Sequence, residues 1–271
     1  MSQHTVYQEL MHAWRLQAQA NPWLTRAFFA TLALLLVLLI MSAAHGLDAQ
    51  HIAHFRLALY GGTAGVLATS AGALLIFLLA RLKHQLQDSM LGFAAGMMLA
   101  ASAFSLILPG LEAAGQLFNS SWASAGVVVL GVGLGSLLML GMDRFTPHEH
   151  QSTGPCGPEC QRISGIWLFV FAIALHNIPE GMAIGVSFAQ GDMSVGLPLA
   201  TAIAIQDIPE GLAVVMALRL TGLSNKRAVL LAAATGLLEV FGAILGFAMA
   251  SSLAIAYPLS MGIAAGAMIF V

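Results

Sequence analysis

Long apolar runs dominate this sequence and limit what the chain can fold into. A helix needs about 20 residues to cross the hydrocarbon core of a bilayer. Strands of a membrane barrel would instead alternate polar and apolar residues over about 10 positions. We therefore predict an all-α polytopic membrane protein with eight spans. They lie at about residues 27–44, 57–80, 89–110, 124–142, 166–188, 195–219, 227–250 and 254–271.

The scarcity of charged residues supports this fold class. Only 8% of the 271 residues are charged and 59% are hydrophobic, whereas soluble domains carry about 25% charged residues. Ten Lys/Arg and twelve Asp/Glu residues cannot cover a water-facing surface of this size. The composition thus excludes a soluble globular domain, a disordered chain and a protein that binds nucleic acid.

The basic residues predict the orientation of the spans. Nine of the ten lie in the N-terminal segment or in the second, fourth and sixth loops, and Arg56 alone lies on the other side. Cytoplasmic loops of membrane proteins are enriched in Lys and Arg. We therefore expect the N-terminus to be cytoplasmic. One span too many or too few would remove this nine-to-one distribution of basic residues, so the distribution also supports the predicted number of spans.

The N-terminal segment has two readings. Arg15 and Arg26 precede the first apolar run, as basic residues precede the core of a secretory signal peptide. Because the run is longer than most signal cores, we interpret it as an uncleaved span. Apolar and polar residues from Tyr7 to Arg15 fall on opposite helical faces, which predicts an interfacial helix ending at Pro22. A frayed tail is the alternative.

Four acidic residues fall near the middle of predicted spans. They are Glu180, Asp207, Glu210 and Glu239. A charged side chain at the bilayer centre costs about 2.5–3.5 kcal/mol, and no Lys or Arg lies within the predicted spans. Hydrogen bonding between helices would explain one such acid but hardly four at one depth. We expect these carboxyl groups to be protonated, hydrated or bound to a cation.

The sequence around these acids is repeated. His-Asn-Ile-Pro-Glu-Gly at residues 176–181 returns as Gln-Asp-Ile-Pro-Glu-Gly at residues 206–211. A short loop joins the two helices, so they are predicted to be antiparallel neighbours with matching residues facing each other. Inverted repeats with interrupted helices at the bilayer centre are typical of transporters.

Each motif places three polar side chains on one helix face, because residues three and four positions apart are neighbours on a helix. Pro179 and Pro209 are expected to kink the two helices. Imidazole, carboxylates and amides without thiolates favour borderline divalent ions, Zn²⁺ first, with Fe²⁺, Mn²⁺ or Cd²⁺ as alternatives. The donors exceed what one ion needs, which leaves room for two ions bridged by Glu180 and Glu210. The six polar residues are His176, Asn177, Glu180, Gln206, Asp207 and Glu210.

These motifs resemble those of the ZIP (Zrt-, Irt-like) family of divalent metal transporters, and look closest to its prokaryotic, GufA-like members. The resemblance covers residues 57–271 and implies a ZIP-like helical bundle with eight core helices. Residues 1–56 would then be an interfacial segment and an extra helix. The last apolar run ends at Val271 without a polar flank, and the resemblance implies one more helix after it.

The resemblance also implies two metal sites. One would use Met98, His176, Glu180, Gln206, Asp207 and Glu210, and the other Asn177, Glu180, Asp207, Glu210 and Glu239. By position alone, Met98 is more simply a core residue, because methionine fills gaps in packing. The pair Gln206-Asp207 stands where many members have His and Asn. This departure puts the metal preference in doubt.

The loop at residues 143–165 carries a second set of metal-binding residue types, and family members often have a His-rich loop here. Its ligand types are His148, His150, Cys156 and Cys160; a linker with incidental ligands is the alternative. A stable disulfide is not expected on the cytoplasmic side. Asp88 and Asp143, at cytoplasmic helix ends, either guide the exit of ions or are solvated boundary residues. On the opposite side, Glu112, His51 and His54 are candidates for attracting cations.

The function implied is uptake of divalent metal into the cytoplasm, with one helix bundle moving against the other to carry the site across the bilayer. A gated metal-selective channel is the alternative. An intramembrane metalloenzyme is disfavoured because no His-Glu-x-x-His motif occurs. We expect no catalytic cofactor, a bacterial inner membrane location, and as partners the metal ions, the bilayer and a second copy in a homodimer. Glycines four residues apart predict tight helix packing at Gly131/Gly135, Gly242/Gly246 and Gly262/Gly266.

Overall fold

A computed structural model describes residues 19, 21–44, 49–78, 84–145, 148–150, 154–156, 165–220 and 222–270. In these ranges nearly all residues are helical, and the all-α polytopic prediction is confirmed. The helices are α2 (Pro22–Ala44), α3 (Ala49–Leu74), α4 (His84–Ala100), α5 (Leu108–Leu117), α6 (Ser121–Phe145), α7 (Gly165–Phe188), α8 (Met193–Leu220), α9 (Asn225–Ala250) and α10 (Ala256–Phe270).

Four short elements complete the described chain. A 3₁₀ turn, η1 (Leu75–Phe77), ends α3, and a π-helical segment, η2 (Ala101–Ile107), joins α4 to α5. Strands β1 (His148–His150) and β2 (Gly154–Cys156) form an antiparallel pair between α6 and α7. This small hairpin is the one addition to the predicted helices.

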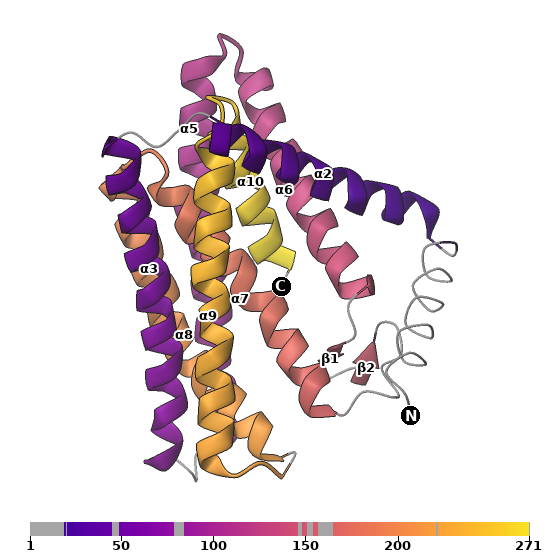
Figure 1. The fold of residues 1–271 in the computed structure, drawn as a ribbon, viewed down its shortest axis with the longest axis vertical. Helices are drawn as coiled ribbons and strands as arrows, with labels where there is room; N and C mark the ends of the chain where they lie inside the picture. The colour runs from indigo at the N-terminus through magenta and orange to yellow at the C-terminus, as the bar shows by residue number, and fades with distance from the viewer. Residues whose placement is uncertain are drawn as a thin grey trace.

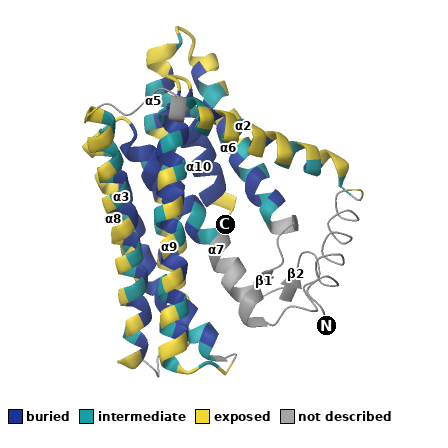
Figure 2. Cartoon of the chain, in the orientation of Figure 1, coloured by how far each residue is buried: buried dark blue, intermediate teal, exposed yellow. Residues whose placement is uncertain are grey.

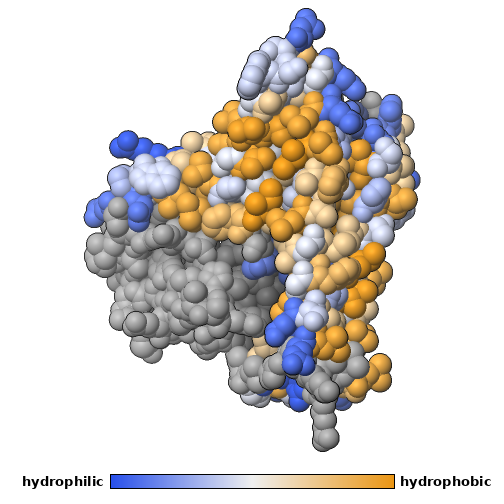
Figure 3. All heavy atoms as spheres, turned by 180° about the vertical axis from the view of Figure 1, so that it is seen from behind, coloured by the Kyte–Doolittle hydropathy of each residue, from blue (hydrophilic) through white to orange (hydrophobic). Residues whose placement is uncertain are grey.

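In the described part of the chain, six stretches of helix are long and apolar enough to cross a membrane. α10 is apolar but shorter, and α7 has 24 residues. Hydrophobic side chains cover most of the described surface in Figure 3, and hydrophilic ones gather toward its ends. The chain is an integral, multi-pass membrane protein. The six stretches are Pro22–Met41, Ala49–Phe77, Asp88–Leu117, Ser121–Met142, Met193–Arg219 and Asn225–Ala250.

The third span continues further than the sequence predicted. It was expected to end at residue 110, but the helix runs through η2 and α5 to Leu117. Pro109 directly follows the π-helical segment, in the first turn of α5. The N–H of Leu108 donates to the carbonyl of Ala103, five residues back, which is the π-helical pattern.

The helices form two groups, which Figure 1 shows from the side. In the first group, α3, α7, α8 and α9 each contact the other three. In the second group, α10 contacts α5, α6 and η2, with α4 continuous with η2. The largest buried cluster lies between the groups, on the inner faces of α7 to α10 (Figure 2). Helix α2 lies across the upper part of the other helices in Figure 1 and contacts α6 and α9.

The closest contacts between helices occur at glycines, as the pairs of glycines four residues apart predicted. A methyl group on Gly185 of α7 would overlap the carbonyl of Ala243 in α9, and one on Gly246 would overlap the carbonyl of Met182. The same relation holds between α6 and α10 at Gly131, Gly135, Gly262 and Gly266. Both contacts therefore depend on the absence of side chains.

Replacing Gly246 by alanine is expected to destabilise the chain by about 1–3 kcal/mol, because overpacking a close contact forces the backbones apart. Thermal unfolding of the detergent-purified protein measures this as a lower Tm. Gly133→Ala is the matched control, because a methyl group there meets nothing within 4 Å. Equal Tm values for the two variants would contradict the packing described for α7 and α9.

Candidate metal centre

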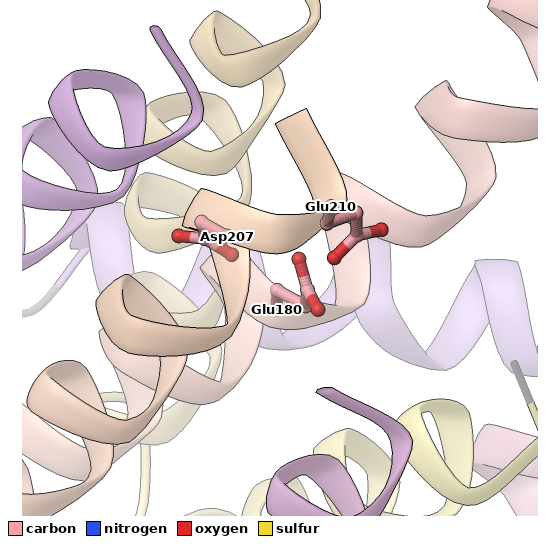
Figure 4. Close-up of side chains that lie close together, drawn as sticks. All are labelled: Glu180, Asp207 and Glu210. Carbon is pink, nitrogen blue, oxygen red and sulfur yellow. The ribbon is translucent and has the colours of Figure 1, made fainter. Parts of the chain in front are cut away.

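Three acidic side chains converge in the middle of the bundle. Glu180 comes from α7, and Asp207 and Glu210 come from α8. Each offers one carboxylate oxygen, and these three oxygens lie within 4.8 Å of one another. Glu180 and Glu210 point toward each other, with Asp207 one turn earlier on α8 (Figure 4). We call these three residues the acidic triad.

The local sequence explains how the acidic triad is held. Asp207 and Glu210 are three residues apart, so they lie on one face of α8. Pro179 and Pro209 lie inside helices that continue past them. Gly181 and Gly211 follow the two glutamates and let other helices approach: a methyl group on Gly181 would overlap the backbone of Glu239 in α9.

Gln206 fixes the orientation of one triad carboxylate. Its Nε2 donates a hydrogen bond of 2.6 Å to Oε1 of Glu180. Both side chains are buried, with 0% and 1% of their surfaces exposed. In the described part of the chain, Oε1 of Gln206 has no hydrogen-bond partner. The amide therefore orients Glu180 and keeps an oxygen donor free.

Glu239 of α9 extends the acidic cluster toward α3. Thr69 donates a hydrogen bond of 3.1 Å from Oγ1 to Oε1 of Glu239. The other oxygen, Oε2, and Oδ2 of Asp207 both adjoin Gly65, where an added methyl group would overlap Oε2 and lie 3.2 Å from Oδ2. When both groups are ionised, neither oxygen has a hydrogen-bond donor among the described residues; a proton on one of them would join the two carboxyl groups in a hydrogen bond.

Buried acceptors without donors are costly, at about 1–3 kcal/mol each. The two oxygens next to Gly65 belong to different carboxyl groups, and no Lys or Arg occurs between residues 163 and 218 to neutralise the acidic triad. A proton or a metal cation placed between them removes this cost. The arrangement is chemically suited to hold a cation that oxygen donors bind.

The structure relates the other predicted ligands to the acidic triad to different degrees. Asn177 is buried on α7, and His176 is half-buried and interacts electrostatically with Glu210. His176 is not one of the three residues within 4.8 Å. Met98 lies in α4, where it packs against the largest buried cluster, and its backbone carbonyl accepts a hydrogen bond of 2.8 Å from Ser102. No described contact joins its sulfur to the carboxylates.

The predicted accessory residues lie away from the acidic triad. Asp88 is exposed near the start of α4, and Asp143 lies in the last turn of α6. His148 and His150 lie in β1, with His148 directly opposite Cys156 of β2 in the strand register. Cys160 and most of the predicted interfacial helix lie outside the described residues. Whether this loop binds metal stays a prediction.

Two residues at the site were not found from the sequence. Thr69 supports Glu239, and Gly65 leaves space for its carboxylate. A single threonine in an apolar helix carries no signal by itself. The spacing of Gly61, Gly65 and Thr69 on α3 does form a small-residue stripe, which was a usable indication of close helix packing.

The fold and the site define a polytopic membrane protein with a buried acidic cluster, and comparisons with known proteins agree. The family profile described as ZIP Zinc transporter matches residues 147–271. Zinc transporter ZIPB of Bordetella bronchiseptica is 57% identical over 263 residues, covering 97% of this chain and 85% of that protein. Zinc transporter GufA of Myxococcus xanthus is 37% identical over 204 residues, covering 75% and 80%. Zinc transporter ZupT of Shigella dysenteriae is 35% identical over 195 residues, covering 69% and 71%.

The chain therefore belongs to the ZIP family of zinc transporters. Its similarity to GufA agrees with the predicted branch of the family. Because the members of this family are transporters, the prediction that the chain is not an enzyme is confirmed.

Proposed function

We propose that this chain takes up divalent transition-metal ions, Zn²⁺ first, into the cytoplasm through the acidic triad. The observation that carries the proposal is three carboxylate oxygens within 4.8 Å at mid-helix, in a region without Lys or Arg. Oxygen and imidazole donors without thiolates suit an ion that must be released again. The relatives named as zinc transporters support zinc as the first choice. Cd²⁺, Fe²⁺ and Mn²⁺ remain alternative substrates.

Two ions can share the cluster. In this proposal one ion binds Met98, His176 and Gln206 together with the acidic triad, and the other binds Asn177 and Glu239 together with it. Glu180 and Glu210 bridge the two ions. The free oxygens of Gln206, Asp207 and Glu239 support this assignment, because each is an available ligand atom.

Alternating access would use the division into two helix groups. The acidic triad and Glu239 all lie on α7, α8 and α9, which belong to the first group. Met98 lies on α4, which is continuous with η2 of the second group and also packs against α8 of the first. Movement of the first group past the second would carry the ions with it and break any bond to Met98. Residues 57–271 would form this transport core, with residues 1–56 as an added segment, a cytoplasmic N-terminus and a bacterial inner membrane location.

Zinc uptake by proteoliposomes across a pH series tests this function. Protons and metal ions compete for the same carboxylate oxygens, so metal affinity rises with pH. We expect saturable uptake that increases several-fold between about pH 5.5 and 7.5, because ligands must be deprotonated to bind metal. Empty liposomes and a series of other metals serve as controls. A rapid, unsaturable current that follows the gradient would favour the gated channel instead.

A further inference from the structure

A cavity of about 310 Å³, lined about equally by polar and apolar residues, opens at the end of the bundle opposite the predicted cytoplasmic loops. Helix α5 contributes Glu112 and Gln116, the loop between α7 and α8 contributes Gln190 and Asp192, and α10 contributes Tyr257. The loop belongs to the first helix group, and α5 and α10 belong to the second. The cavity therefore lies on the seam between the two groups.

Both acids in this cavity are accessible to solvent, and Asp192 is held ionised. Oδ1 of Asp192 accepts hydrogen bonds of 2.8 Å from the N–H and 2.6 Å from the Oγ of Ser194. These bonds cap the start of α8 and lower the pKa of Asp192. Asp192 therefore carries its negative charge at and well below neutral pH, beside the exposed carboxyl group of Glu112.

Tyr257 gives a second indication of a ligand. Its side chain is only 8% exposed, and it lines the cavity. What remains accessible of this side chain therefore faces the cavity. Its hydroxyl group makes no hydrogen bond to a described residue, and it is not among the oxygens closed off from solvent, so it is free to bind a ligand in the cavity. An oxygen donor is thus available next to two carboxylates.

We propose that this cavity captures a hydrated divalent cation before the ion enters the acidic triad. Six waters at about 30 Å³ each occupy on the order of 180 Å³, so the cavity accommodates an ion with its first hydration shell. Carboxylate, phenol and amide oxygens are the donors that hard, hydrated dications prefer. The capture site rests on the proposed uptake function, for which it supplies the entrance.

Direct binding of Mn²⁺ tests the capture site without measuring transport. The full chain is purified with Glu180→Gln and Glu210→Gln to weaken the acidic triad, and free Mn²⁺ is measured by its electron paramagnetic resonance signal. Mn²⁺ is the probe because it prefers oxygen donors over the Cys and His of the loop. Adding Glu112→Gln and Asp192→Asn is expected to remove one weakly bound Mn²⁺ per chain. Asparagine preserves the helix cap, so α8 is retained.

Two further variants distinguish binding of Mn²⁺ by specific ligand atoms from its general attraction to negative surface charge. Tyr257→Phe removes only the hydroxyl group and is expected to raise the Kd for Mn²⁺ about threefold, as loss of one hydrogen-bonding oxygen does. Glu9→Gln removes an acidic charge from the predicted cytoplasmic segment and is expected to leave the Kd unchanged. Unchanged Mn²⁺ binding in the Glu112/Asp192 variant would overturn the proposal. A failure of zinc uptake by the unaltered chain would overturn the proposed function. The Mn²⁺ binding result would still show whether the cavity binds a cation, because that measurement does not depend on transport.

Discussion

Replacing Glu180 and Glu210 together by glutamine is expected to weaken zinc binding by at least about 100-fold. Both residues are proposed as direct ligands, and loss of a residue that merely supports a ligand already costs about 10–100-fold in metal affinity. Glutamine keeps the size of each side chain, and Gln206 can still donate to an amide oxygen at position 180. The change removes two negative charges from a site with no Lys or Arg between residues 163 and 218. Isothermal titration of the detergent-purified chain with zinc measures the loss.

The same titration needs a control that keeps the site intact. Glu9→Gln removes one acidic residue from the N-terminal segment and is expected to bind zinc as the unaltered chain does. Both proteins should show the same Tm without metal, so that unfolding is not mistaken for loss of ligands. Loss of a single ligand is expected to weaken zinc binding by more than about threefold. If the Glu180/Glu210 variant binds zinc within about threefold of the unaltered chain, the assignment of these ligands is contradicted.

Replacing Gly65 by alanine is expected to lower zinc uptake by about 10–100-fold, the range found when groups that support ligands are lost. The new methyl group would occupy the position of Oε2 of Glu239, and it would lie 3.2 Å from Oδ2 of Asp207. Because the displaced atoms are at the end of a flexible side chain, the carboxylate can move while α3 stays in place. Radiolabelled zinc uptake per reconstituted chain measures the loss, and Tm is expected to stay within a few degrees.

The matched control for Gly65 is Gly133→Ala, whose methyl group meets nothing within 4 Å. It is expected to keep both uptake and Tm. If Gly65→Ala lowers Tm as strongly as uptake, the damage lies in helix packing. If neither value changes, the space next to Gly65 has no part in holding Glu239.

The core of the site was predictable because its chemistry is concentrated in one repeated motif. Acidic residues in the middle of apolar runs carry their own signal, since the bilayer makes an unexplained carboxylate costly. The repeat then placed Glu180 near Glu210, and the structure brings their oxygens together with that of Asp207. The predicted spans were also largely right, because hydrophobic length is a direct requirement of crossing a bilayer.

Other features depend on tertiary contacts that leave little trace in the sequence. Nothing in the sequence near Thr69 indicates that its hydroxyl group meets Glu239, 170 residues later in the chain. The division into two helix groups depends on which small-residue faces meet, and the sequence does not say which pairs of faces do so. The third span extends past residue 110, although proline usually predicts the end of a helix. Pro109 directly follows a π-helical segment, which shifts the backbone hydrogen-bond pattern there.

The central claim is tested most directly by uptake of radiolabelled zinc into proteoliposomes. One preparation contains the unaltered chain, and the other contains an equal amount of the Glu180→Gln, Glu210→Gln variant. If ions cross through the acidic triad, the unaltered chain gives saturable uptake and the variant gives no more than empty liposomes. Uptake by the variant at the rate of the unaltered chain would contradict that claim.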